Sequence, residues 1–242
     1  MNEKNILTVK ELANYIRFHE GHLKPLKENY DYSGLIMNNG VWRLKLASAD
    51  CRLQKELIES NDDDLDLLIH SKNKPRPLSS MIDETLIDLD FYADNRSKAL
   101  SKLAKMASSA RVCSSYEELY LELDNRERLL STAIGNGVAI PHSRFPHQLI
   151  YDKPKLIIAR SSSGVNFGAP DGKKVHLFLM PCAPTQFVHF RMIAQIAKLL
   201  HIPNVLERFR NIKKKGDFKL VVQAFERLNI LPADEPDSYR HN

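Results

Sequence analysis

The sequence predicts an α/β fold for the larger, C-terminal part of the chain, with helices packed on a sheet. Short apolar runs rich in strand-forming residues occur at Val138–Ile140, Lys155–Arg160 and Val175–Met180. Amphipathic helical patterns lie around them, and alternation of the two types is typical of a sheet covered by helices. At 242 residues the chain has room for this domain and for a smaller second one.

Four segments of this region have helical patterns. An apolar stripe predicts a helix over Asp90–Ala107. Ser115, with Glu118 three residues later, forms a capping-box pattern that predicts a second helix up to about Arg128. Two further amphipathic helices are expected at His189–His201 and Lys219–Leu228.

The boundaries of the domains follow from a change in composition. Residues 61–78 combine four aspartates with a Lys-Pro-Arg-Pro run and precede two serines, a composition that disfavours regular structure. We expect an N-terminal domain over residues 1–60, a linker over 61–78, the α/β domain over 79–232 and a tail over 233–242. Residues 208–219 are rich in Lys and Arg, which indicates either a solvated helix end or a docking patch for an acidic partner.

The N-terminal domain is expected to hold a capped helix at 8–16, a short segment at 22–29, a hairpin at 34–46 and a helix at 48–59. This order resembles small winged-helix domains of the excisionase and MerR type, which implies DNA binding through residues 1–60. Pro25 falls in the implied recognition helix, and nine Lys and Arg nearly balance eight Asp and Glu. DNA binding and a retained fold with another use both stay open.

The composition excludes several classes of protein. Hydrophobic residues make up 43% of the chain and charged residues 27%, which is ordinary for a globular protein. No apolar run approaches the ~18 residues of a membrane span, and the N-terminus lacks a signal-peptide pattern, so we expect a cytoplasmic protein without membrane insertion. Cys51, Cys113 and Cys182 form no Cys-x-x-Cys pair, and the histidines lack metal-ligand spacing. We therefore expect no metal site and no cofactor.

The most informative stretch is Gly135–Arg144, which places His142 after an apolar strand and a proline. A neutral imidazole is a nucleophile whose charge state changes near physiological pH. His142 is thus a candidate phosphoryl acceptor, and the alternative is a structural histidine.

Residues 79 to about 230 resemble the enzyme IIA domain of the fructose/mannitol class of the phosphoenolpyruvate-dependent sugar phosphotransferase system. Several blocks in the right order carry the resemblance. They are Asn125–Glu127, Ser131–Thr132, Ile134–Arg144, Gly164–Gly172 and the helix that begins near His189. Pro141–Arg144 and the Asn166–Gly172 block look most like the nitrogen-regulatory branch. The resemblance implies a mixed sheet packed by helices.

The resemblance also implies roles for three residues. His142 is the implied phosphoryl acceptor, and a histidine-containing phosphocarrier protein of the HPr type supplies the phosphoryl group. His189 and Arg126 are implied to complete the active site. Phosphoryl transfer needs in-line placement and neutralisation of charge, and a guanidinium fork suits phosphate oxygens. Thr132 and Asn136 are candidate phosphoryl-binding donors, or else they cap the local turn.

Some features of the sequence depart from this pattern or compete with it. Gly135 and Gly137 are expected to let the backbone approach the site closely. Arg128 competes with Arg126 for the role of cation. The loop over residues 183–188 is about two residues shorter than usual in the family, without its acidic residues, and Phe190 stands where leucine is common.

Three functions remain open at this point. The first is a relay that passes the phosphoryl group from His142 to a IIB domain for sugar transport. The second is a regulatory protein whose phosphorylation state decides which partner it holds. The third is a transcriptional regulator whose DNA-binding front end is controlled by the IIA-like domain. No second phosphoacceptor motif or membrane domain is present in the sequence, which favours regulation over transport.

Overall fold

The computed structural model describes residues 35–38, 41–44, 76–143 and 153–229. In its N-terminal part, β1 (Leu35–Asn38) and β2 (Val41–Leu44) pair antiparallel, with Leu35 opposite Leu44. The predicted hairpin is therefore confirmed. The helices predicted at 8–16, 22–29 and 48–59 lie outside the described residues, and so does the winged-helix interpretation that rests on them.

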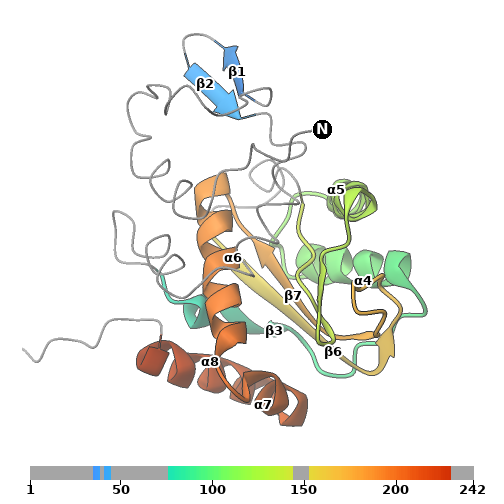
Figure 1. Cartoon of the computed structure of the whole chain (residues 1–242), viewed down its shortest axis with the longest axis vertical. Coiled ribbons are helices and arrows are strands. Elements are labelled where there is room, and N and C mark those ends of the chain that lie inside the picture. The colour runs from blue at the N-terminus through green and yellow to red at the C-terminus, as the bar shows by residue number, and fades with distance from the viewer. Residues whose placement is uncertain (1–34, 39–40, 45–75, 144–152, 230–242) are drawn as a thin grey trace, which may run out of the picture.

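The C-terminal part is built on a mixed five-stranded sheet, as predicted (Figure 1). The strands are β3 (Ile82–Asp88), β4 (Ala133–Gly135), β5 (Val138–Ala139), β6 (Lys155–Val165) and β7 (Val175–Cys182). Their order across the sheet is β3-β6-β7-β5-β4. The pairs β3/β6 and β5/β7 are parallel, whereas β6/β7 and β4/β5 are antiparallel.

Helices cover both faces of this sheet. α4 (Arg96–Ser109) and α5 (Tyr116–Leu129) lie on one face, and α6 (Gln186–His201), α7 (Val205–Asn211) and α8 (Lys215–Asn229) lie on the other (Figure 1). Alternate residues of the central strands supply the two cores, because successive side chains of a strand point to opposite faces. Leu156 and Ile158 pack toward α6, whereas Ile157 and Ala159 pack toward α4. This double burial explains the uninterrupted apolar runs of the sequence.

The predicted helices are confirmed with shifted ends. α4 begins at Arg96 rather than Asp90, because Asn95 caps it by accepting a hydrogen bond from the Lys98 amide. The backbone before it is still engaged with the sheet, where the Phe91 amide donates to the Arg160 carbonyl. Ser115 caps α5 through the Glu118 amide, as predicted. β3, β4 and α7 were not predicted from the sequence.

Residues 76–79, at the predicted boundary between linker and α/β domain, contact the helices of the α/β part. A short 3-10 helix, Leu78–Met81, precedes β3, and Leu78, assigned above to the linker, is fully buried. Gln195 of α6 donates to the Arg76 carbonyl over 3.0 Å, and the Ser79 amide donates to the buried carboxylate of Glu226. Buried polar side chains of two helices thus hold residues 76–79. None of the helices that the structure describes is long and apolar enough to cross a membrane.

Candidate functional site

His142 lies just beyond the end of β5, on the side of the sheet that faces α6. Ile140, two residues earlier, packs in the core shared with α6, and the alternation of a strand sends His142 in the same direction. Its ring is only 2% exposed. Nδ1 lies 2.9 Å from the Ile140 carbonyl oxygen. Because a carbonyl only accepts hydrogen bonds, Nδ1 carries the proton, and a neutral ring in this orientation has its lone pair at Nε2.

His189 comes from the first turns of α6 and lies against His142. Thr185 caps this helix by accepting from the Val188 amide, and the His189 amide donates to the Thr185 carbonyl over 3.0 Å. The two imidazole centroids are 4.8 Å apart with the rings tilted by 46°, and His189 is 3% exposed. The structure therefore brings together two histidines that are 47 positions apart in the sequence. Phe190, which stands where leucine is common in the family, is buried in the core on the α6 face.

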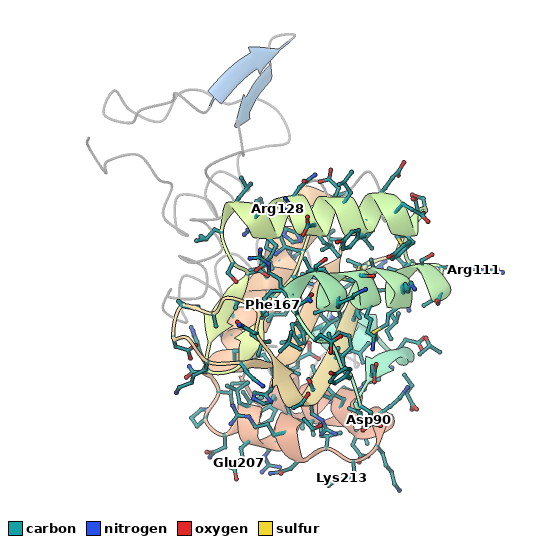
Figure 2. The ribbon with its side chains drawn as sticks, turned by 90° about the vertical axis from the view of Figure 1, so that its right-hand side faces the viewer. Asp90, Arg111, Arg128, Phe167, Glu207 and Lys213 are labelled. Carbon is teal, nitrogen blue, oxygen red and sulfur yellow. The ribbon has the colours of Figure 1, made fainter. Side chains whose placement is uncertain are left out.

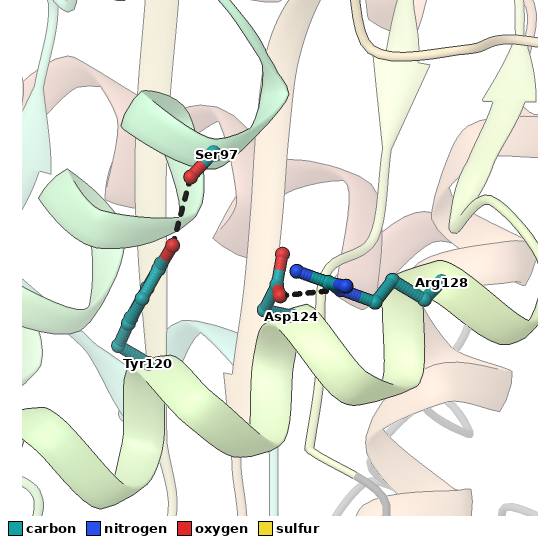
Figure 3. Close-up of polar contacts among 4 residues, drawn as sticks. All are labelled: Ser97, Tyr120, Asp124 and Arg128. Atoms are coloured by element: carbon teal, nitrogen blue, oxygen red, sulfur yellow. Dashed lines mark hydrogen bonds and ion pairs between the residues drawn. The ribbon is translucent and has the colours of Figure 1, made fainter.

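Arg126 and Arg128 occupy very different environments in the last turn of α5. Arg126 is 1% exposed, and its Nη1 donates to the Leu130 carbonyl over 2.9 Å. The Arg128 side chain is 70% exposed and pairs with Asp124 through an Nε to Oδ2 contact of 2.6 Å, four residues back on the same helix (Figure 3). A charge acts more strongly where water is excluded, so the Arg126 guanidinium is less screened than that of Arg128.

Thr132 lies at the same end of the β4–β5 hairpin as His142, but its hydroxyl points to Glu127. Its carbonyl accepts from the Ile140 amide over 3.0 Å, which places it at the His142 end of the β4–β5 hairpin. Its Oγ1 donates to Oε2 of Glu127 over 2.5 Å. A hydroxyl has one proton, which Thr132 directs to Glu127 in this structure, and a role of Thr132 in phosphoryl binding stays a prediction.

Glu127 is a residue of this region to which the sequence analysis assigned no role. Its carboxylate is 2% exposed and accepts from the Ser131 hydroxyl over 2.7 Å and from the Thr132 amide over 3.0 Å. Burial raises the pKa of Glu127, while these hydrogen bonds and neighbouring Arg126 lower it. Its place next to Arg126 and five residues before Thr132 is the signal that could have singled it out.

Asn136 lies at the other end of β5 from His142, and its role in phosphoryl binding stays a prediction. It is exposed at the β4–β5 turn with a φ of 53°. Its amide donates to Asp171 Oδ2 over 2.9 Å, and its carbonyl accepts from Arg210 over 3.1 Å. Gly135 and Gly137 have φ values of 89° and 77°. They shape this turn, where positive φ favours glycine, rather than a close approach to His142.

The lysine- and arginine-rich run lies away from this site. Its members on α7 and at the start of α8 are mostly exposed, and Figure 2 shows Lys213 and Arg128 at opposite ends of the α/β part. Arg210 is bonded to the Asn136 carbonyl, and the Arg208 guanidinium lies 6.0 Å from the Phe225 ring. These contacts are those of a solvated helix end. Within the described ranges, no three His, Cys, Asp or Glu side chains are grouped as a metal site would require.

Comparison with solved structures shows which fold this is. The crystal structure of the nitrogen regulatory protein IIA-Ntr from Neisseria meningitidis superposes with a TM-score of 0.54 and 22% identity, covering 60% of this chain and 98% of that one. The complex of enzyme IIAMtl and phosphorylated enzyme IIBMtl from Escherichia coli contains a chain that matches with a TM-score of 0.52 and 17% identity, over 59% of this chain and 97% of that one. The described α/β part therefore has the fold of IIA proteins.

The sequence comparisons agree with the fold. A nitrogen regulatory protein of Bradyrhizobium diazoefficiens is 30% identical over 137 residues, which is 55% of this chain and 86% of the relative. The family model of the phosphoenolpyruvate-dependent sugar phosphotransferase system, EIIA 2, matches residues 80–224. The chain belongs to this family. The resemblance recognised in the sequence is thereby confirmed for the α/β part, and residues 1–79 lie outside the match.

Proposed function

We propose that this chain carries a phosphoryl group on Nε2 of His142, received from a histidine-containing phosphocarrier protein of the HPr type. The observation that carries the proposal is the state of His142: its Nδ1 proton is held by the Ile140 carbonyl, and its ring lies 4.8 Å from that of His189. This arrangement leaves the lone pair on Nε2, the nitrogen that would attack phosphorus.

The proposed transfer conserves atoms and charge. The Nε2 lone pair attacks the phosphorus atom, the P–N bond to the carrier's histidine breaks, and its electron pair returns to the carrier's ring. The proton of His142 stays on Nδ1, and the Ile140 carbonyl oxygen that accepts its hydrogen bond stabilises the positive charge that the phosphorylated ring acquires. His189 donates to the phosphoryl oxygens, and Arg126 stabilises their negative charge from the α5 side. Because His142 is only 2% exposed, docking of the carrier must uncover Nε2.

A regulatory role is the form of this function that we favour. The relative from Bradyrhizobium, of which this chain covers 86%, is a nitrogen regulatory protein. A phosphoryl group on His142 adds two negative charges to a pair of histidines that carries none when neutral. Such a change can create or disrupt the contacts with a partner protein, which then binds one phosphorylation state in preference to the other. The recipient of the group would be a regulated protein or a IIB domain, since a relative occurs in a complex with phosphorylated IIB. The family match begins at residue 80, so it lends nothing to DNA binding by residues 1–60.

The test is a reconstituted phosphorylation. The purified chain is incubated with phosphoenolpyruvate, enzyme I and an HPr-type carrier, and the bound phosphate is examined for its stability in acid and base. We expect acid-labile, base-stable phosphate on the wild type and none on His142→Ala, with His201→Ala as the matched control from the exposed end of α6. Absence of label on the wild type, or equal label on His142→Ala, would exclude the proposal.

A second measurement separates the two roles. Labelled protein is mixed with a purified IIB domain of the mannitol class, and the label is followed on both chains. Retention on this chain supports the regulatory role, whereas rapid and complete transfer to the IIB domain supports a relay in transport.

A further inference from the structure

Glu127 is the centre of a buried hydrogen-bond network between α5 and the hairpin that ends in His142. Four contacts converge on its carboxylate: from the Ser131 hydroxyl at 2.7 Å, from the Thr132 hydroxyl at 2.5 Å, and from the Thr132 amide to both oxygens at 3.0 and 3.1 Å. A 2% exposed carboxylate that accepts from a backbone amide and two hydroxyls is strongly held. Glu127 thereby fixes residues 131 and 132 against the end of α5.

The network continues from Thr132 to the imidazole of His142. The Thr132 carbonyl accepts from the Ile140 amide over 3.0 Å, and the carbonyl of the same Ile140 accepts from His142 Nδ1 over 2.9 Å. The Ile140 amide is thus bound to Thr132, which Glu127 holds in turn, and the carbonyl of the same residue faces Nδ1 of His142. Each step is a hydrogen bond, and all the groups involved are buried.

We propose that Glu127 is a positioning residue that sets the tautomer and the orientation of the His142 ring. This inference rests on the proposed function, in which Nε2 of His142 is the nucleophile. When Glu127 holds Thr132, the Ile140 carbonyl faces Nδ1 and keeps the proton there. When this hold is lost, the carbonyl is free to turn away, and the proton distributes between the two ring nitrogens. Only the tautomer protonated on Nδ1 has a lone pair at Nε2, so the loss slows phosphoryl transfer without removing a group that touches the phosphate.

The structure also supplies a matched pair of substitutions at Thr132. Thr132→Val keeps the shape of the side chain and removes the hydroxyl that donates to Glu127, whereas Thr132→Ser keeps the hydroxyl. Glu127→Gln keeps the length of the side chain and replaces one accepting oxygen with an NH₂ group, which cannot accept from the Thr132 amide.

The experiment measures the tautomer and the rate separately on the full chain. Long-range ¹H–¹⁵N NMR spectra report which nitrogen of His142 carries the proton as the pH is varied, and rapid-quench labelling by the phosphorylated carrier reports the rate. We expect Glu127→Gln and Thr132→Val to raise the fraction of the Nε2-protonated tautomer and to slow labelling at least about tenfold, since the wrong tautomer withdraws the nucleophile. Thr132→Ser is expected to restore both readouts.

The outcomes distinguish this inference from the function on which it rests. An unchanged His142 tautomer in folded Glu127→Gln and Thr132→Val would overturn the positioning role, whatever the rate does. If Glu127→Gln does not fold, the Val/Ser pair at Thr132 decides the question. A wild type that shows the Nδ1-protonated tautomer but takes no label from the carrier would reject the proposed function and leave the tautomer result intact.

Discussion

The imidazole of His189 lies 4.8 Å from that of His142, although one comes from α6 and the other from the end of β5. Both rings are almost fully buried, so an added phosphoryl group would meet His189 in a region of low dielectric constant. In the proposed function, His189 acts as a hydrogen-bond donor to this group.

Removing the His189 side chain is expected to slow phosphorylation of His142 by about a hundredfold, the effect of losing one donor to a transition-state oxygen. His189→Gln, whose amide still donates, is expected to recover part of that loss. The measurement is the rate of labelling in a rapid-quench experiment. Equal rates for the wild type and His189→Ala would contradict the role.

Substitution of Arg126 is expected to slow the labelling of His142, whereas substitution of Arg128 is not. Arg126→Lys loses the planar fork and the Leu130 contact in a buried site, so we expect labelling to fall at least about tenfold. Arg128→Lys changes an exposed pair and is expected to alter the unfolding free energy by about 0.5 kcal/mol or less, with labelling unchanged. Labelling rates and denaturant titrations of both variants check this. The assignment fails if Arg128→Lys is the slow one.

Substitution of Asn136 is expected to affect stability and leave phosphorylation unchanged. Asn136→Gly tolerates the φ of 53°, whereas Asn136→Val places a β-branched residue there and is expected to destabilise the fold by about 1–2 kcal/mol. Chemical denaturation and labelling are measured on both variants. Slower labelling of folded Asn136→Gly would show that the side chain acts in the site after all.

The buried carboxyl of Glu226 is expected to make stability depend on pH. Burial raises its pKa above the ordinary value of 4.5, against the lowering effect of the hydrogen bonds from Ser79 and Leu78. A carboxyl with a raised pKa in the folded state stabilises the fold below its unfolded pKa, and this stabilisation is lost as the pH rises through the folded pKa.

Glu226→Gln removes this titration. The unfolding free energy of the wild type minus that of Glu226→Gln is therefore expected to be largest below pH 4.5, the ordinary pKa of the group. It should decline as the pH rises, with a slope of at most about 1.4 kcal/mol per pH unit. Urea titrations between pH 4 and 8 measure this difference, and a value independent of pH would refute the assignment.

Much of the α/β part could be predicted from local sequence. Ser115 caps its helix as its capping box predicts, and the runs at Lys155–Arg160 and Val175–Met180 lie in strands that are buried on both faces. β4 was missed because three residues that end in glycine carry too little periodicity to be recognised as a strand. α7 was missed because its 7 residues are too few to show a helical period.

His142 and its apolar, glycine-punctuated frame were determined by the sequence alone, since the motif is contiguous and its order is specific. Tertiary structure alone decided which partners surround it. It brought His189 to His142 and buried Arg126 but not Arg128. It also turned the Thr132 hydroxyl to Glu127 and placed Asn136 at the far end of the strand. The physical reason is that hydrogen-bond direction and burial depend on how segments distant in the sequence pack together, and spacing along the chain does not encode them.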